Sequence, residues 1–461
     1  RLVEVGFLSK SAYATGDDTT GTVAFEYSPD GKPTLATVYD DQAQILYQNQ
    51  FDYDDRGNLV AEWQSHTGAV GGSTPFVGYE WEYSPADETH GNFDRLLSLT
   101  YPARPEATGP RELTFHYGSA PDAIDGQLNR ITAIDDSELG TGLATYSHMG
   151  GGSRRVIAGF GNGVQAAETE QGDYAWAYDR FGRLRDLDYR DAVDEIIQRY
   201  RYGYDLAGNR TFARVTQSPA TDTPNHDNDR SYLYSYDGLR RLVGADLGRL
   251  NNDNTAITPH PVVALAKQSV WELDNLGNWD LFERQTDLDG DGSYGEAGEG
   301  YQATVHEVDS ANQITSHASF DALGVPLGED LFVHDPAGNL VCDGTYVYQY
   351  DAWNQLVQVN ERGDLEYDPD APEDDDFDDA GRIAPNSANN PVHAIGTLVA
   401  QYAYDALGRL IVAYEATDLG TPAYQTVRFY YDGVRRIQEV VQGQGEDPDV
   451  TRAEYVYGPD Y

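Results

Sequence analysis

The sequence predicts an all-β protein in which a continuous antiparallel sheet of hairpins spirals into a shell or tube. First, its 461 residues include 34 Tyr against 14 Phe and 6 Trp, and the tyrosines alternate with Thr, Val and Leu as in half-buried strands. Second, 47 Gly and 21 Pro are spread along the chain, which indicates frequent turns. Third, a short turn unit recurs. Right-handed strand twist would curl so long a sheet.

The recurring unit is an aromatic-rich run that ends in Asp, two variable residues, Gly, and then Asn or Arg. Among its clearest copies are YDRFGRL, from Tyr178, and YDALGRL, from Tyr404. Four copies keep the length but change the turn, namely YDGLRRL, VDSANQI, YDAWNQL and YDGVRRI. Seven copies keep both turn residues, in the pairs Asp54 and Gly57, Asp179 and Gly182, Asp205 and Gly208, Asp274 and Gly277, Asp335 and Gly338, Asp378 and Gly381, and Asp405 and Gly408.

The chemistry of this unit predicts a β-hairpin. The Asp side chain accepts a backbone N–H in the turn, and Gly supplies the positive φ that closes it. Asn312 and Asn354 replace Gly in two copies, and Asn tolerates the same left-handed conformation. In two other copies the glycine, Gly238 or Gly433, directly follows the Asp. We expect a different turn type there.

The spacing of the copies favours one regular body. From Asp351 to Asp432 the turn aspartates recur at equal intervals, so the hairpins, including the one at Asp378, should lie side by side. Longer intervals between Asp205 and Asp309 should extrude loops. We therefore expect a single repeat body over residues 1–461, with degenerate repeats in 1–172 and clear repeats in 173–461.

The net charge of −46 argues against nucleic acid as a partner, because phosphates would be repelled. Lys10, Lys32 and Lys267 are the only lysines. This acidic, lysine-poor composition fits a surface adapted to salt or divalent cations, and simple solubility is the alternative. We expect no membrane span in this segment, because no apolar run is long enough. Because the sequence begins at Arg1, we expect a fragment of a longer chain.

These repeats resemble the YD-repeat, or RHS-repeat, family of bacterial proteins, which is related to the YD shell of the animal teneurins. The resemblance is strong over 173–461 and weak before it, and YDALGRL and YDRFGRL are close to the family consensus. It implies a hollow β-shell and a secreted or cell-surface location. In many members the shell encloses a C-terminal toxin released by a self-cleaving core, which is not found here. In teneurins it belongs to an adhesion ectodomain.

A calcium loop is predicted in the acidic insertion at 287–299. Asp287, Asp289 and Asp291 occupy the first, third and fifth positions of such a loop, and the carbonyl of Ser293 would occupy the seventh. The last position holds Gly298 instead of a bidentate Glu, so Glu296 or Glu299 would have to substitute. If calcium binds, it would stiffen the loop. The alternative is a solvated acidic insertion without a metal.

Nothing in the sequence predicts catalysis. No GxSxG, HExxH, CxxC or phosphate-loop motif occurs, and Cys342, the only cysteine, is interpreted as a small apolar residue. The acidic run Glu373–Asp376 is interpreted as a solvated loop. The aromatic stripes are interpreted as packing, with sugar binding as the alternative.

The sequence therefore predicts a non-enzymatic structural wall of a secreted or surface-displayed shell or fibre. One alternative is a cocoon for a C-terminal toxin or effector beyond residue 461. Another is an adhesion module that binds cell-surface glycans. The expected partners are the rest of its own chain, an enclosed effector, glycans or other copies of itself.

Overall fold

The computed structural model describes residues 3–6, 20–83, 94–118, 123–150, 155–167, 177–217, 230–258, 266–288, 300–363, 395–417, 424–445 and 447–458. By its internal contacts the chain divides into two compact units. Unit 1 comprises Arg1–His116, Asp135–Gly140 and Leu331–Tyr461, and unit 2 comprises Tyr117–Ile134 and Thr141–Asp330. The single repeat body expected over 1–461 stays a prediction.

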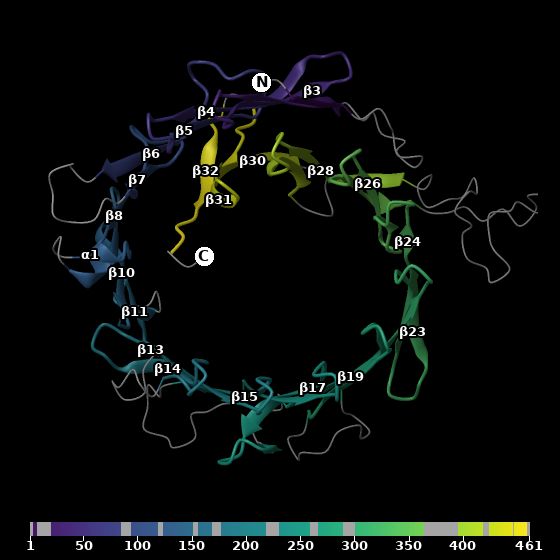
Figure 1. Cartoon of the computed structure of the whole chain (residues 1–461). Coiled ribbons are helices and arrows are strands. Elements are labelled where there is room, and N and C mark those ends of the chain that lie inside the picture. The colour runs from purple at the N-terminus through teal and green to yellow at the C-terminus, as the bar shows by residue number, and fades with distance from the viewer. Residues whose placement is uncertain are drawn as a thin grey trace, which may run out of the picture. The chain divides into compact units, whose positions relative to one another are not determined.

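The predicted fold class is confirmed, because the described chain is almost entirely antiparallel β-strand (Figure 1). Most strands pair with the next strand along the chain, and they form two sheets, β1–β23 and β24–β32. Only Phe332 separates β23 from β24. One residue is too short for a reversing turn, so β24 does not pair with β23 and begins the second sheet. Within the described residues, no helix is long and apolar enough to cross a membrane.

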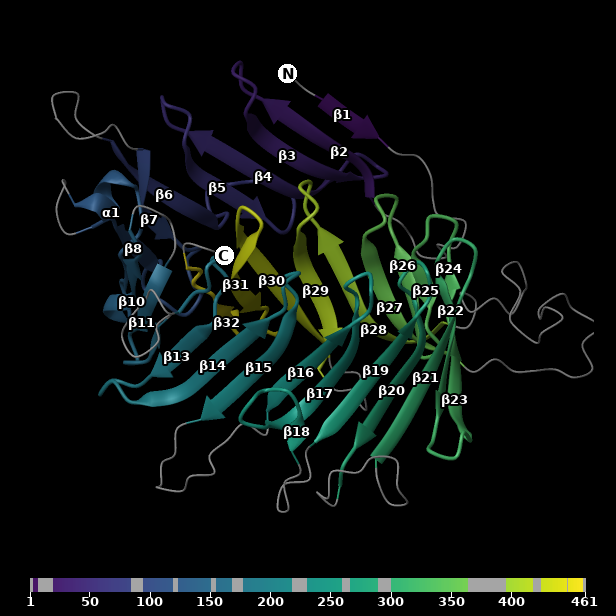
Figure 2. The same ribbon diagram turned by 60° about the horizontal axis from the view of Figure 1, so that its bottom comes forward.

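Unit 1 contains two rows of neighbouring strands, one from each end of the chain (Figure 2). The first row consists of β1 (Val3–Gly6), β2 (Thr20–Tyr27), β3 (Pro33–Asp40), β4 (Ile45–Tyr53), β5 (Leu59–Ser65), β6 (Phe76–Tyr83), β7 (Asp94–Thr100) and β8 (Glu112–His116). The second consists of β24 (Val333–His334), β25 (Leu340–Cys342), β26 (Tyr346–Tyr350), β27 (Leu356–Arg362), β28 (Ile395–Tyr404), β29 (Leu410–Ala416), β30 (Tyr424–Asp432), β31 (Arg435–Val441) and β32 (Val450–Glu454).

Unit 2 is a curved sheet of successive hairpins with one short helix (Figure 1). Its elements, with β9, β10 and β23 extending into unit 1, are α1 (Ile124–Gln127), β9 (Ala133–Asp136), β10 (Gly140–His148), β11 (Arg155–Phe160), β12 (Gln165–Ala167), β13 (Asp186–Arg190), β14 (Ile196–Tyr204), β15 (Arg210–Gln217), β16 (Ser231–Tyr236), β17 (Leu242–Leu250), β18 (Ile257–Thr258), β19 (Lys267–Leu273), β20 (Trp279–Thr286), β21 (Gly300–Val308), β22 (Ile314–Phe320) and β23 (Pro326–Leu331).

The turn at Asp405 shows how the repeat unit closes a hairpin. The N–H of Asp405 donates to the carbonyl of Arg409, and the N–H of Gly408 donates back to the carbonyl of Asp405, both at 3.0 Å. The Asp405 carboxylate accepts the N–H groups of Leu407 and Arg409 at 2.9 Å. Gly408 has φ +79°, where a side chain would be strained. The other predicted turn residues with positive φ are Gly57, Gly182, Gly208, Gly277, Asn312, Gly338 and Asn354.

The two repeat turns in which the glycine directly follows the Asp differ from each other. The copy at Asp237 was expected to adopt a different turn type, which is wrong. Its N–H donates to the carbonyl of Arg241, as in the other turns, and Arg240 takes the positive φ of +67°. At Asp432 the turn does differ, because Asp432 pairs directly with Arg435. The structure also contains unpredicted turns of the common type at Asp40, Asp191 and Asp321.

The equal spacing around Asp378 did not predict the strand order. Strand β27 pairs directly with β28, with Val359 opposite Ala400, so no hairpin stands between the turns at Asp351 and Asp405. The expectation of a side-by-side hairpin at Asp378 is therefore wrong. Asp378 and Gly381 lie outside the described residues. The error arose because equal spacing in sequence does not by itself determine which strands pair.

Candidate functional site: a ladder of turns and a buried polar seam

Several neighbouring repeat turns are tied together by a tyrosine at the end of a strand, which in most cases directly precedes the turn Asp. Tyr204 donates its hydroxyl to the carbonyl of Leu184 at 2.7 Å, and Tyr404 donates to the carbonyl of Leu356 at 2.8 Å. In each case the acceptor follows the turn of the preceding hairpin. The same bond joins Tyr236 to Arg210, Tyr431 to Leu410, and Tyr457 to Arg436. We call this series the turn ladder.

The residue four positions after the Asp adds a second tie. Arg409 donates to the carbonyl of Gly433 at 2.7 Å, and Arg241 donates to that of Asp274 at 2.6 Å. Hydrogen bonds within a turn also change the pKa of its Asp side chain. The backbone and side chain of Arg241 lower the pKa of Asp237 by favouring its charged form. The ladder thus explains why the unit requires Tyr, Asp and a long polar residue together.

A second feature, the polar seam of unit 1, joins strands from the two ends of the chain. On β5, Glu62 and Gln64 are 2% and 1% exposed, and His66, just after β5, is 7% exposed. All three contact β30 or the turn before β29. This feature is not predictable from the sequence pattern of β5. Polar residues that alternate with Ala61 and Trp63 are typical of a strand face exposed to water, and nothing local distinguishes a polar interface from such a face.

Gln64 and His66 bind the part of β30 that lies beyond its backbone pairing with β29. The amide of Gln64 donates to the carbonyl of Tyr431 at 2.6 Å and accepts its N–H at 3.0 Å. The ring Nε2 of His66 lies 2.9 Å from the carbonyl oxygen of Phe429. Backbone pairing between β29 and β30 ends at Arg428, so these side chains contact backbone groups beyond it. Burial lowers the pKa of His66 to about 4.

At the end of the seam, Arg409 lies between two buried carboxylates. Its guanidinium contacts Glu62 at 2.5 Å and Asp405 at 2.7 Å, and it stacks over the ring of Tyr431. Burial raises the pKa of Glu62, and Arg409 opposes that rise. Burial also opposes the charge on Arg409, but the two carboxylates outweigh it and raise the pKa of Arg409. This end of the seam therefore depends on the positive charge of Arg409.

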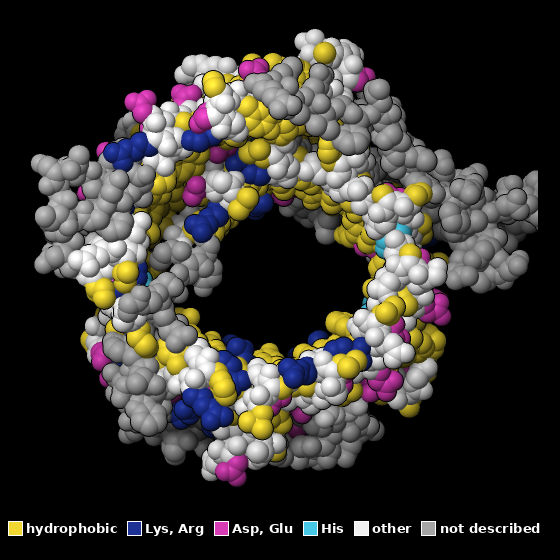
Figure 3. Space-filling model, in the orientation of Figure 1, with side chains coloured by type: hydrophobic (Ala, Val, Ile, Leu, Met, Phe, Trp, Pro, Cys, Tyr) yellow, Lys and Arg dark blue, Asp and Glu magenta, His cyan; other side chains and the backbone are white. Residues whose placement is uncertain are grey.

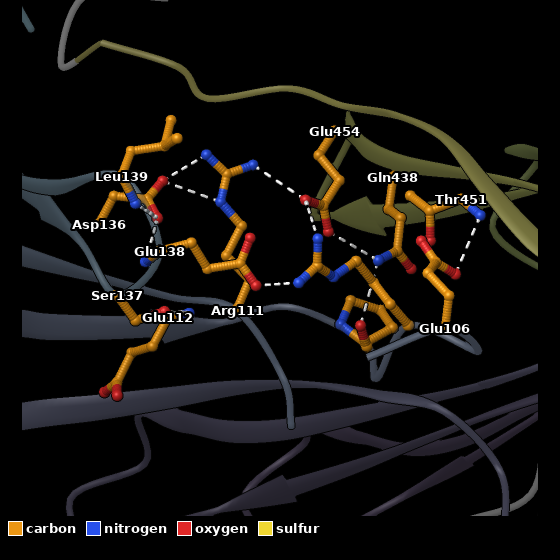
Figure 4. Close-up of polar contacts among 12 residues, drawn as sticks. Glu106, Arg111, Glu112, Asp136, Ser137, Glu138, Leu139, Gln438, Thr451 and Glu454 are labelled. Carbon is orange, nitrogen blue, oxygen red and sulfur yellow. Dashed lines mark hydrogen bonds and ion pairs between the residues drawn. The ribbon is translucent and has the colours of Figure 1, made fainter. Parts of the chain in front are cut away.

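A second ion cluster of the seam joins three segments of unit 1 around Arg111 (Figure 4). Its Nε donates to Asp136 at 2.8 Å, and its Nη1 donates to Glu454 at 3.1 Å. The other oxygen of Glu454 accepts the amide of Gln438 at 3.0 Å, and that amide also donates to the carbonyl of Pro102. Burial opposes the charge on Arg111, but Asp136 raises its pKa overall.

The predicted calcium loop is described only at its start. Asp287 is 1% exposed at the end of β20, and its N–H donates to the carbonyl of Ala266 at 2.9 Å. Asp289, Asp291, Ser293 and Glu296 lie outside the described residues. Across the described ranges, no group of three or more His, Cys, Asp or Glu side chains is placed to hold a metal ion. Calcium binding stays a prediction.

No protein-family model and no curated protein matches this chain. Among solved structures, the crystal structure of TcdB2-TccC3-TEV is similar, with a TM-score of 0.50 and 12% identity over 92% of this chain and 21% of that one. TcdB2-TccC3-Cdc42 has a TM-score of 0.45 and 13% identity, over 94% and 21%. The Photorhabdus luminescens Tc holotoxin pore has 0.43 and 12%, over 95% and 24%.

The similarity to TcdB2-TccC3-TEV shows a shared fold at low sequence identity. This chain spans about a fifth of the length of that structure. The shared fold agrees with the shell-type β-sheet expected from the repeats, whereas membership of the YD-repeat family stays a prediction.

Proposed function

We propose that this chain forms part of the wall of a secreted or cell-surface YD-repeat shell, and that its role is structural. The observation that most directly supports a structural role is the polar seam of unit 1. Glu62, Asp405 and Arg409 are 2%, 4% and 8% exposed and bind one another, so they are placed to hold strands together. A catalytic group would instead need access to its substrate.

The turn ladder supports the same role. A single hairpin is marginally stable in water and cannot bury its own aromatic face. Bonds such as those of Tyr404 to Leu356 and Arg409 to Gly433 make each hairpin depend on its neighbour. Such nearest-neighbour coupling is how repeat proteins build extended bodies, and a wall is the function that this coupling serves directly.

Electron microscopy of the purified chain tests the proposal. We expect particle averages with a hollow centre bounded by a single β-wall. Averages that show a solid particle, or two beads in variable arrangements, would contradict a wall. The comparison sample is the double variant Arg111→Met and Arg409→Met. Because both changes leave buried carboxylates without a counter-charge, its averages should show an opened or heterogeneous wall.

A second candidate is a cocoon for an effector encoded beyond residue 461. The shared fold with TcdB2-TccC3-TEV supports this candidate. The test joins a small folded reporter after Tyr461 and exposes the fusion to protease. Enclosure would be supported if the reporter were protected in the wild-type chain and digested in the variant with Arg111→Met and Arg409→Met. Equal digestion in both proteins would exclude it.

Glycan binding, the third possibility raised by the aromatic stripes, stays a prediction that a glycan array would test. In unit 2 the rings of Tyr232 and Tyr234 stack on each other at 5.8 Å, with 1° between their planes. In unit 1 the rings of Tyr414 and Tyr424 stack at 4.9 Å. In both pairs one face of each ring is turned toward its neighbour, so the geometry favours packing.

A further inference from the structure

The strand register of unit 2 gathers acidic strand residues on one face of its sheet and leaves the other face without them. Residues directly opposite each other on paired strands project from the same face. In the strands from β13 to β22, the acidic residues lie on one face of the sheet. Asp280, which lies in a β-bulge, is not assigned to either face. The acidic residues are Asp186, Asp188, Asp246, Glu272, Glu283 and Glu307.

The opposite face, which we call the acid-free face, carries aromatic and basic side chains. It is defined by Tyr200, Tyr202, Tyr232, Tyr234, Lys267, Trp271, Phe282, Arg284, Gln302 and His306. In Figure 3, magenta atoms along unit 2 gather on the convex side, whereas the concave side shows dark blue and yellow atoms. The chain as a whole has 77 acidic and 31 basic residues, so a face without acidic strand residues contrasts with its overall charge.

Two cations on this face, Lys267 and Arg284, have no carboxylate partner among the described residues. Arg210, at the start of β15, lies over the ring of Tyr202 at 4.3 Å and likewise has no described carboxylate partner. On the acidic face, by contrast, Arg199 contacts Asp186 at 2.5 Å and Asp188 at 3.2 Å. Cations left unpaired in so acidic a chain are available to an anionic partner.

Lys267 and Arg284 also lie close together. Arg284 is directly opposite Ser269, two residues along β19 from Lys267. On one side of this pair, Tyr232 faces Leu247, which faces Lys267. On the other side, Gln302 faces Arg284. The arrangement offers two positive charges, an amide and aromatic ring edges, which suit carboxylates on an extended chain.

We propose that the acid-free face of unit 2 binds a polypeptide segment rich in Asp and Glu, whose carboxylates pair with Lys267 and Arg284 and extend toward Arg210. Charge complementarity selects this partner. The ring geometry favours polypeptide over sugar, because Tyr232 and Tyr234 stack face to face and Arg284 lies over the ring of Phe282 at 5.3 Å. The proposal goes beyond the wall function and does not depend on it.

The test measures fluorescence anisotropy of a labelled peptide of Glu, Ala and Tyr with the purified chain at low salt. The wild-type chain should bind this peptide despite its own net negative charge, and added salt should weaken binding. In the double variant Lys267→Gln and Arg284→Gln, the loss of two charge-assisted contacts should weaken binding about tenfold or more. The matched control, Arg201→Gln with Arg240→Gln, removes the same charge from exposed sites off this face and should change binding less than about twofold.

Three results would overturn the proposal. One is no binding by the wild-type chain, and another is equal weakening in both double variants. The third is equal or tighter binding of a peptide with Lys in place of Glu. Polygalacturonate serves as the acidic-glycan arm, and binding to it without binding to the acidic peptide would assign the face to a polysaccharide instead. Circular dichroism and melting of both variants establish that each retains its fold.

Discussion

Arg409 illustrates how single side chains stabilise unit 1. It neutralises Glu62 and Asp405, donates to the carbonyl of Gly433 and lies over the ring of Tyr431. Glu62 lies 347 positions away in the sequence. The contribution of Arg409 to the free energy of unfolding therefore depends on its buried partners. Without it, two buried carboxylates would lack a counter-charge.

Replacing Arg409 with Met should lower the free energy of unfolding by about 3–5 kcal/mol, because two buried carboxylates would lose their counter-charge. Urea unfolding followed by circular dichroism measures the change. The control is Arg428→Met, whose partner Asp449 is partly exposed, so its ion pair should contribute less than about 1 kcal/mol. Equal losses in the two variants would show that the seam does not depend on Arg409.

His66 should make the stability of unit 1 depend on pH. Its pKa is about 4 in the folded protein against an ordinary 6.5, so between these values the unfolded state binds a proton that the folded state does not. The free energy of unfolding should therefore fall by about 3 kcal/mol as the pH drops from 6.5 to 4.

The variant His66→Gln isolates this effect, because its amide can still donate to the carbonyl of Phe429. Urea unfolding of both proteins across the same pH range separates His66 from carboxylates that titrate in both. Stability of the variant should fall less steeply. A wild-type chain and variant with parallel pH profiles would show that His66 does not titrate in this way.

The hairpin is the element on which the sheet is built, and its turn residues are not interchangeable. Gly408 has φ +79°, and a Cβ placed on it would lie 3.1 Å from the side chain of Gln355. Gly238, in another repeat turn, has no positive φ and no atom within 4 Å of such a Cβ. The two glycines therefore form a matched pair within one family of turns.

We expect Gly408→Val to destabilise the chain by about 1–3 kcal/mol, because a β-branched residue is strained at positive φ. Gly238→Val should change stability by less than about 0.5 kcal/mol. Thermal and urea unfolding of both variants test the expectation. Similar values for the two would refute the account of the turn.

The connection between β20 and β21 should bind calcium if the acidic insertion at 287–299 acts as a calcium loop. Isothermal titration of the wild-type chain should then show binding that is lost in Asp289→Ala with Asp291→Ala, because carboxylate ligands are removed. Alanines in the run Glu373–Asp376 provide a control of similar charge. The prediction would be wrong if the wild-type chain gave no heat of calcium binding. It would also be wrong if the variant with Asp289→Ala and Asp291→Ala still gave that heat.

In the molecule as a whole, unit 1 is assembled from segments at both ends of the chain. Gln64 and Tyr431 are 367 positions apart and exchange two hydrogen bonds. Tyr47 of β4 packs against a core cluster of β29 and β30, whose members are Ile411, Ala413, Val427, Phe429 and Tyr431. The stability of the first strands should therefore be linked to that of the last ones.

Replacing Gln64 with Ala should leave the N–H and carbonyl of Tyr431 without these partners, at about 1–3 kcal/mol for each group. Hydrogen exchange should then quicken in β5 and β30 together. Gln401→Ala, which removes an exposed contact with Gln358, should leave both strands unchanged. Faster exchange confined to β5 would contradict the coupling of the two ends.

Local chemistry along the sequence determined the fold class and most repeat turns. The bonds at Asp405 join residues no more than four positions apart, so Asp, Gly and the flanking aromatic residues specify them. The turns at Asp40 and Asp191 escaped notice because Ala43 and Asp194 hold the positive φ in place of Gly. There the pairing of the flanking strands overrides local preference.

Only the tertiary structure decided which strands pair and which polar faces are buried. The alternation of Glu62, Gln64 and His66 is the same whether that face meets water or β30, and their partners lie hundreds of residues away. The acid-free face likewise follows from the register that aligns Tyr232, Leu247 and Lys267 across three strands. A shift of one residue would turn each side chain to the other face, so the placement of the acidic residues on one face is a property of strand pairing.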